Sequence, residues 1–341
     1  MNKDRLNNAF DIITNEIKED LEIINKKSNE ELDETLKNYS EVMSKLNEVS
    51  NGELSMLDKS NKLNELLLKI SDDKNYAFMP DLAEINKCIK YLKENNYTEM
   101  LTSIYYNLAS IYDDIGKENT ANYADNSAAY YYTLAIEKMA ELVKSNMKLY
   151  CESFGTLLCS ATVFFDRTKR KVNIDIDYIK LGWESAINFN NYELAYVISR
   201  NFSIIFDNLN ELEKSQEIGW LLLKTGKEKV DKNLDYNLKE LIGNAQGQSN
   251  SFRKFQGNYN KQIAEAYFYA GYFAECSDKE SSNYRNKQIA LNYYWYCCFT
   301  KARVDSEYAK KAYSAALKVP FDKDCREIIK EIRNIKKANR K

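Results

Sequence analysis

Histidine does not occur anywhere in the 341 residues of this sequence. Its absence excludes catalytic sites of the Ser-His-Asp and Cys-His kinds, as well as zinc sites that use imidazole ligands. The sequence also has no phosphate-binding glycine loop and no acidic cluster with calcium-loop spacing. We therefore expect a protein that is not an enzyme and has no catalytic, cofactor or metal residues. An unusual enzyme that uses carboxylates is the minor alternative.

Glycine and proline are scarce, with ten Gly and two Pro. A fold with many strands needs many turns, and Gly and Pro are too few to form them. The sequence therefore predicts an all-α fold. No apolar run approaches the ~20 residues needed to span a bilayer. The net charge of −2 gives no overall attraction to nucleic acid or anionic lipid.

Cysteine occurs seven times, an odd number, and no Cys-x-x-Cys pair is present. This pattern is typical of reduced thiols. The charged start of the chain lacks the apolar core of a signal peptide. We therefore expect a cytoplasmic protein.

Tyrosine is nearly missing from the first part of the chain, where Tyr39 is the only one before Tyr76. Apolar residues recur there in steps of three and four, close to a coiled-coil seam. We interpret residues 1–71 as an N-terminal helical hairpin or bundle, whose helices could mediate homo-oligomer contacts. Residues 71–75 form the joint, and 76–341 a helical-repeat domain.

One stretch of this second domain occurs twice. Residues 96–140 return without a gap at 258–302, with nine of 45 positions identical. Each copy predicts two amphipathic helices separated by a polar Lys-Glu turn, Lys117-Glu118 or Lys279-Glu280. A recurrence of this length indicates stacked helical pairs, because one pair cannot bury its own apolar face.

Outside the two copies, apolar spacing predicts further helices. They are expected near 175–189, 192–207, 211–229, 235–245, 306–319 and 323–338, the last capped by Asp322. The polar segment Gln246 to Gln256, bracketed by glycines, is interpreted as a loop.

The repeat carries large, small and aromatic residues at a recognisable spacing. They are Tyr105, Leu108, Ala109, Tyr112, Gly116, Ala128, Tyr132 and Ala135, then Tyr267, Ala270, Gly271, Ala274, Ala290, Tyr294 and Cys297. Over about 95–320 the pattern resembles tetratricopeptide repeats. The resemblance implies a right-handed α-solenoid whose concave groove binds peptides or protein segments.

The chain departs from that family in one respect. Ala109 and Ala128 lie 19 positions apart, as do Gly271 and Ala290, which is longer than the family's spacing. The additional residues would either add about two helical turns or form a projecting polar loop. The sequence leaves both open.

In the family, the first helices of the repeats line the groove. The resemblance therefore makes Tyr105, Asn107, Tyr112, Tyr267 and Tyr269 the candidate groove residues. Tyr106 and Ser110 occupy positions where the carboxylate-binding members of the family have Lys and Asn, so that class of ligand is not expected.

Two aromatic runs, Tyr130–Tyr132 and Tyr293–Tyr296, cover most of a helix circumference, because successive residues differ by 100°. Either the helix is sandwiched between neighbours, or the rings line a groove.

Two basic segments form a candidate basic patch of Arg167, Lys169, Arg170, Lys171, Arg333, Lys336, Lys337 and Arg340. Cations at a helix C-terminus also complement its dipole, so a solvated helix end explains the second segment equally well. Nucleic-acid binding is the alternative.

From these patterns we expect a non-enzymatic scaffold or adaptor that binds a protein or peptide. The order of parts also resembles bacterial quorum-sensing regulators, so a peptide-responsive regulator that acts on a protein partner is one alternative. A nucleic-acid-associated protein that uses the basic tail is another.

Overall fold

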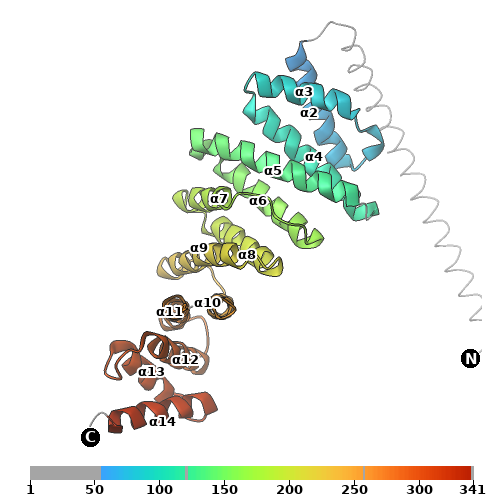
Figure 1. The fold of residues 1–341 in the computed structure, drawn as a ribbon. Helices are drawn as coiled ribbons and strands as arrows, with labels where there is room; N and C mark the ends of the chain where they lie inside the picture. The colour runs from blue at the N-terminus through green and yellow to red at the C-terminus, as the bar shows by residue number, and fades with distance from the viewer. Residues whose placement is uncertain (1–54, 120–121, 256–257, 339–341) are drawn as a thin grey trace, which may run out of the picture. The chain divides into compact units, whose positions relative to one another are not determined.

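The computed structural model describes residues 55–119, 122–255 and 258–338. Most of the predicted block 1–71 lies outside these residues, as does Arg340 of the basic patch. All regular elements of the described residues are helical (Figure 1). They are α2 (Met56–Asp73), the 3-10 helix η2 (Tyr76–Phe78), α3 (Leu82–Glu94), α4 (Thr98–Asn119), α5 (Asn122–Ser145), α6 (Met147–Thr168), α7 (Ile176–Asn188), α8 (Tyr192–Asn208), α9 (Leu212–Asp231), α10 (Leu238–Arg253), α11 (Asn260–Cys276), α12 (Ser282–Thr300), α13 (Glu307–Leu317) and α14 (Lys323–Ala338).

The chain divides into two compact units, 1–121 and 122–341. In the first unit, α2 packs against both α3 and α4. Leu63, Leu67 and Ile70 recur every three or four residues and are all buried, so they form the core face of α2. Because most of 1–71 is not described, its independence as a domain stays a prediction.

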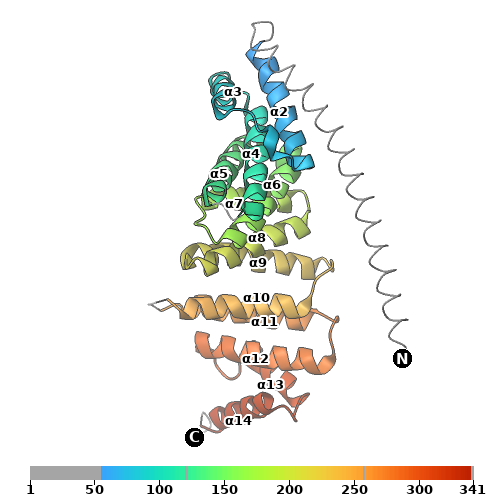
Figure 2. The same cartoon turned by 90° about the vertical axis from the view of Figure 1, so that its right-hand side faces the viewer.

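The second unit is an α-solenoid. Each helix from α5 to α14 packs against the next one in the chain, and several pack against the helix two places further on (Figure 2). Each amphipathic helix thus buries its apolar face between neighbours, which confirms the predicted all-α solenoid. No helix of the described ranges is long and apolar enough to cross a membrane.

The two copies of the repeated stretch form different structures. The helices of the first copy, α4 and α5, belong to different units, whereas α11 and α12 of the second copy pack closely within one unit. Lys117 and Glu118 continue α4 as helix, while Lys279 and Glu280 lie in the loop between α11 and α12. The longer spacing therefore extends the helix in one copy and forms a loop in the other.

The sequence predicted a loop at Gln246 to Gln256. This prediction is wrong for residues 246–253, because α10 continues to Arg253. Ala245, Gln248 and Phe252 recur every three or four residues and are buried, so they give α10 a core face. Apolar periodicity does not reveal this face, because one of its buried residues, Gln248, is polar. The Gln248 side chain can be buried because its Nε2 donates a hydrogen bond to the Gln216 carbonyl at 2.8 Å.

The other predicted helices are confirmed at 176–188, 192–208, 212–231, 307–317 and 323–338. The predicted cap is also present: Asp322 Oδ1 accepts from the backbone N–H groups of Asp324 and Cys325 at 3.0 and 3.2 Å. A carboxylate at this position satisfies donors that have no partner within the helix.

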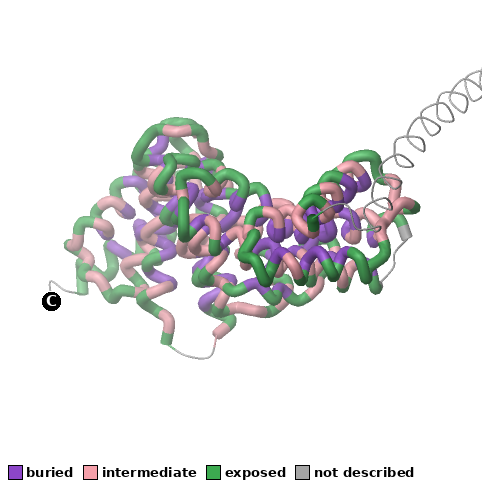
Figure 3. The backbone as a smooth tube through the Cα atoms, turned by 90° about the horizontal axis from the view of Figure 1, so that it is seen from above, coloured by how far each residue is buried: buried purple, intermediate pink, exposed green. Residues whose placement is uncertain are grey.

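The two aromatic runs divide between core and surface. Tyr132 is 3% exposed, while Tyr130 on the same helix is 58% exposed. In the second run Tyr293 is buried and donates to Glu275 Oε2 at 2.6 Å, whereas Trp295 is exposed. Figure 3 shows the same alternation of buried and exposed stretches along the helices. This division matches helices that lie between neighbours.

Candidate functional site

A groove runs along α6, α8 and α10 in the second unit. It consists of two adjoining cavities of about 380 and 350 Å³, the first between α6 and α8 and the second between α8 and α10. Arg200 and Ile204 on α8 line both cavities, so they form one continuous surface. We call this surface the α6–α8–α10 groove.

The floor of the second cavity is α9, which contributes Ser215, Gly219 and Leu222. Two reciprocal hydrogen bonds fix α9 to α8: the Ser203 hydroxyl donates to the Ser215 carbonyl at 3.1 Å, and the Ser215 hydroxyl donates to the Ser203 carbonyl at 2.9 Å. At Gly219 a Cβ would lie 2.1 Å from the Gln248 side chain. The lack of a side chain lets α10 approach α9 closely.

The part of the groove between α6 and α8 is apolar. Val163 on α6 is 62% exposed and Ile204 on α8 is 43% exposed. Beside them, the Asn201 side chain donates to the Thr162 hydroxyl at 3.2 Å, which connects the two helices. Two exposed β-branched residues in a hollow form a surface on which an apolar group of a partner could be buried.

The part between α8 and α10 is lined by amide side chains. Asn244 Nδ2 donates to the Tyr196 hydroxyl at 2.8 Å. Asn208 and Asn250 also line the cavity and are exposed, so water can pair with their side-chain amides. An amide side chain offers both a donor and an acceptor, which matches the groups of a peptide main chain.

Three small residues of α10, spaced four positions apart, line the groove: Gly243, Gly247 and Ser251. Both glycines are exposed, and a Cβ built on either has no other group within 4 Å. The Ser251 hydroxyl is buried without a hydrogen-bond partner among the described residues. The Ser249 hydroxyl on the same helix is buried without a partner in the same way, whereas Ser185 and Ser199 donate to the carbonyl four residues earlier.

Two ion pairs lie along the groove. Arg200 pairs with Glu240 at 2.7 Å, which joins α8 to the first turn of α10. At the other end, Lys254 pairs with Asp207 at 3.2 Å. Both pairs are partly exposed, so water and salt reduce their attraction.

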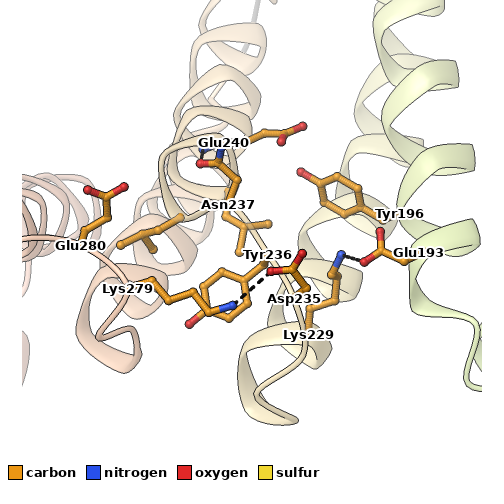
Figure 4. Close-up of a pocket in the computed structure, with 11 residues that line it drawn as sticks. Glu193, Tyr196, Lys229, Asp235, Tyr236, Asn237, Glu240, Lys279 and Glu280 are labelled. Atoms are coloured by element: carbon orange, nitrogen blue, oxygen red, sulfur yellow. Dashed lines mark hydrogen bonds and ion pairs between the residues drawn. The ribbon is translucent and has the colours of Figure 1, made fainter.

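A third cavity of about 440 Å³ lies where α8 and α10 begin (Figure 4). Each of its four carboxylates has a cationic partner: Glu193 pairs with Lys229, Asp235 with Lys279, Glu240 with Arg200, and Glu280 with Lys239. Burial, and then the charge of Glu240, raise the pKa of the Tyr196 hydroxyl, which stays neutral. The charges of this cavity are thus balanced within the chain.

The five groove candidates from the sequence lie elsewhere, none of them lining the α6–α8–α10 groove. In the first unit, Tyr105 and Asn107 are buried and Tyr112 is half-buried, and the Asn107 amide donates to Asn64 Oδ1 at 3.1 Å. In the second unit, Tyr267 is buried and Tyr269 is half-buried in the core. Their role in binding stays a prediction that would require several of them to leave buried positions.

The basic residues near 166–171 are paired within the chain. Arg167 pairs with Asp125 at 3.0 Å, Lys169 pairs with Asp166 at 2.5 Å, and Arg170 donates to Asn126. Residues 166–168 of this segment are the end of α6. Lys171 is exposed.

On α14, Arg333 Nε donates to the Tyr313 hydroxyl at 3.0 Å, and the Lys336 ammonium lies 4.9 Å from the same ring's centroid. Lys337 is exposed. Of the seven patch residues that the structure describes, Arg167, Lys169, Arg170, Arg333 and Lys336 thus have partners in the chain.

Sequence reasoning missed the residues that line the groove. Val163 and Ile204 resemble any other apolar residue in a helical pattern, and only packing distinguishes them. One signal was present: Gly243 and Gly247 are four residues apart, so they share a helix face. The expectation of a loop at Gln246 to Gln256 conceals this shared face.

No protein-family model matches this chain, and no curated protein matches it. One solved structure, titled "Computational Design of Self-Assembling Cyclic Protein Homooligomers", aligns over 87% of this chain and 94% of its own, at 13% identity and a TM-score of 0.18. A score this low carries no argument about fold or assembly. The architecture therefore rests on the helix packing described above.

Proposed function

We propose that this protein is a non-enzymatic helical-repeat scaffold that binds a peptide or protein segment in the α6–α8–α10 groove. The observation that carries the proposal is the exposure of Val163 and Ile204 in a hollow beside the exposed amide side chains of Asn208 and Asn250. An apolar strip next to main-chain-like donors and acceptors suits a polypeptide. The balanced charges of the neighbouring cavity do not suit an ionic small molecule.

We further infer that the helix pairs are related to tetratricopeptide repeats. Asn190, Asn210 and Asn233, with φ of 57°, 58° and 51°, stand at the turns before α8, between α8 and α9, and after α9. Asparagine tolerates this left-handed conformation better than most residues, which permits short turns between antiparallel helices. In such pairs α6, α8 and α10 would be first helices, the ones that line the groove in that family. The helix α11 would then be a second helix, and not the first helix that the repeat pattern around Tyr267 predicts.

We also propose that the protein acts in the cytoplasm. All seven cysteines are free thiols in the structure, including the pair Cys297 and Cys298 on α12. Free thiols are usual where the environment is reducing. A nucleic-acid function has less support, because Arg167 and Arg170 are engaged within the chain.

A comparative affinity purification tests the proposed function. The wild-type chain, the variant Ile204→Asp and the control Phe321→Asp are each used to capture partners from native-host extract, and the captured proteins are quantified by mass spectrometry. Ile204 lies in the groove, while Phe321 is 93% exposed in the loop before α14. We expect Ile204→Asp alone to lose the specific partner. Equal capture by all three proteins would contradict the groove as the binding surface.

A further inference from the structure

Arg253, the last residue of α10, is held over aromatic rings and pairs with no carboxylate among the described residues. Its guanidinium carbon lies 5.6 Å from the ring centroid of Tyr267, 6.0 Å from that of Trp295 and 5.3 Å from that of Phe299. Arg253 Nη2 also donates to the Tyr267 hydroxyl at 2.8 Å. We call Arg253 and these three rings the Arg253 cluster. The rings fix the position of a long side chain that otherwise has many rotamers.

The arginines beside the α6–α8–α10 groove are balanced by carboxylates, whereas Arg253 is not. Arg167 pairs with Asp125 at 3.0 Å, and Arg200 pairs with Glu240 at 2.7 Å. Water pairs with an exposed guanidinium, and a cation at the end of α10 complements the helix dipole. These two effects explain why the charge is tolerated. They do not explain why it is fixed over three rings.

Trp295 on α12 gives a second observation at the same place. It is 41% exposed, although its ring stacks on that of Tyr267 with the centroids 6.2 Å apart. The two other tryptophans are half-buried, and the indole N–H of Trp183 donates to the Thr225 hydroxyl at 2.7 Å. A large exposed ring leaves apolar area in water, which the binding of another group removes. Tryptophan and arginine are also the residue types that contribute most to binding at protein interfaces.

The Arg253 cluster lies beside the end of the groove. Lys254, the next residue in the chain, lines the second cavity of the groove. The Gln246 side chain donates to Asn292 Oδ1 at 3.0 Å, which places α12 next to α10. The helices α8, α10 and α12 therefore follow one another. From Ile204 on α8, the cluster is one to two helix diameters away, about 10–20 Å, which an extended chain spans with about three to six residues.

We infer that the Arg253 cluster binds an acidic side chain of the peptide whose apolar side chains occupy the groove. This inference rests on the proposed function and specifies the chemistry of the peptide. Tyr267 occupies one of the five N–H groups of the guanidinium, so the others can pair with both oxygens of a carboxylate. Trp295 then packs against the methylene groups of the same acidic side chain. The acidic residue follows or precedes the apolar one by about three to six residues.

A single carboxylate fits the Arg253 cluster better than a nucleic acid does. Binding to a nucleic-acid backbone uses a row of cations, because each phosphate carries a charge. Along this groove, however, Lys254 pairs with Asp207 at 3.2 Å and Arg200 pairs with Glu240. One fixed guanidinium beside an exposed tryptophan provides for one anionic group.

The test selects binders from a displayed library of random linear dodecapeptides on the full-length chain and measures the best peptide by fluorescence polarisation. The selected peptides should share an Asp or Glu at a constant distance from an apolar residue. Arg253→Met keeps an apolar stem over the rings but removes the charge, and should weaken binding about tenfold. Changing the acidic residue of the peptide to its amide should weaken binding to wild type similarly. The same peptide change should have little further effect on Arg253→Met, because the two groups act as a pair.

Three controls keep the outcome specific. Arg326→Met removes an exposed cation on α14 that has no side-chain partner among the described residues, and should bind like wild type. Arg253→Lys keeps the charge without the planar fork and should bind more weakly than wild type but more tightly than Arg253→Met. Added salt should weaken peptide binding by wild type more than by Arg253→Met. The amide peptide is measured on the unchanged protein, so this arm holds even if a variant folds poorly.

The inference is overturned if no linear peptide is selected, if the selected peptides share no acidic residue, or if Arg253→Met binds within about twofold of wild type. It is also overturned if Arg253→Met loses affinity for a single-stranded oligonucleotide while peptide binding is unchanged. If Ile204→Asp abolishes peptide binding but Arg253→Met does not, the proposed function stands and only the acidic contact is wrong. If both variants bind the peptide like wild type, both proposals fail.

Discussion

Arg200 on α8 and Glu240 on α10 form an ion pair of 2.7 Å across the groove. The pair joins two helices that otherwise face each other over an open cavity. The Arg200 and Glu240 side chains are 43% and 35% exposed, and exposed pairs contribute about 0–1 kcal/mol. Arg200→Ala should therefore reduce the free energy of unfolding by less than about 1 kcal/mol, measured by urea denaturation. A loss above about 2 kcal/mol would show that the pair holds the solenoid together.

Gly271 and Tyr293 show how closely α11 and α12 approach. A Cβ at Gly271 would lie 2.6 Å from two atoms of the Tyr293 ring, and the hydroxyl of that ring is held by Glu275. Gly271→Ala should therefore destabilise the protein by about 1 kcal/mol or more, despite alanine's better helix propensity. Thermal or urea unfolding measures this, with Gly243→Ala as the matched control that should not destabilise. Equal stability of the two variants would contradict the close contact.

Tyr130 and Tyr132 separate surface from core within one helix. Tyr132 is buried, with its ring centroid 5.3 Å from that of Phe164 on α6, while Tyr130 is exposed. Tyr132→Ala should cost about 3 kcal/mol through the cavity it leaves. Tyr130→Ala should change stability by less than about 0.5 kcal/mol. Both are measured by chemical denaturation, and similar losses for the two would contradict this packing of α5.

Asp322 combines a helix cap with an ion pair to Lys287 at 2.7 Å. The hydrogen bond from Lys287 lowers the pKa of the Asp322 carboxyl. A group with a lowered pKa stabilises the folded state above its unfolded pKa, and this contribution disappears as the pH falls through the folded pKa. The stability difference between wild type and Asp322→Asn should therefore be present at pH 7 and shrink below about pH 4.

Asp322→Ala is the matched comparison, because alanine loses the cap as well as the charge. It should cost about 1 kcal/mol in free energy of unfolding, while asparagine keeps a capping oxygen and should cost less. Melting curves at several pH values measure both effects. A wild-type advantage over asparagine that did not change between pH 7 and pH 3 would contradict the role of the charge.

Local sequence patterns were sufficient for most of the fold. Apolar spacing and a capping residue predicted the helix that begins after Asp322, because these signals are contained in the helix itself. The continuation of α10 could not be predicted in this way, since its buried face includes Gln248, whose partner is a carbonyl of α9. Polar residues that are satisfied by another helix look like loop residues in the sequence.

The candidate site was harder to predict than the fold. Tyr105 and Tyr267 were chosen from a family pattern, but both are buried. Ile204 is exposed only because α6, α8 and α10 leave a hollow at its position, and that spacing depends on how several helices pack together. A single sequence does not contain this information in local form.

Site-specific photo-crosslinking tests the central claim most directly. A benzophenone amino acid is placed at Ile204 in the groove, or at Phe321 outside it, in the full-length chain, and each protein is irradiated in native-host extract. The account predicts a discrete crosslinked polypeptide from position 204 that is missing from position 321. Its yield should fall when Val163→Asp is introduced into the same groove. Crosslinking to the same partner from position 321 but not from 204 would contradict the account.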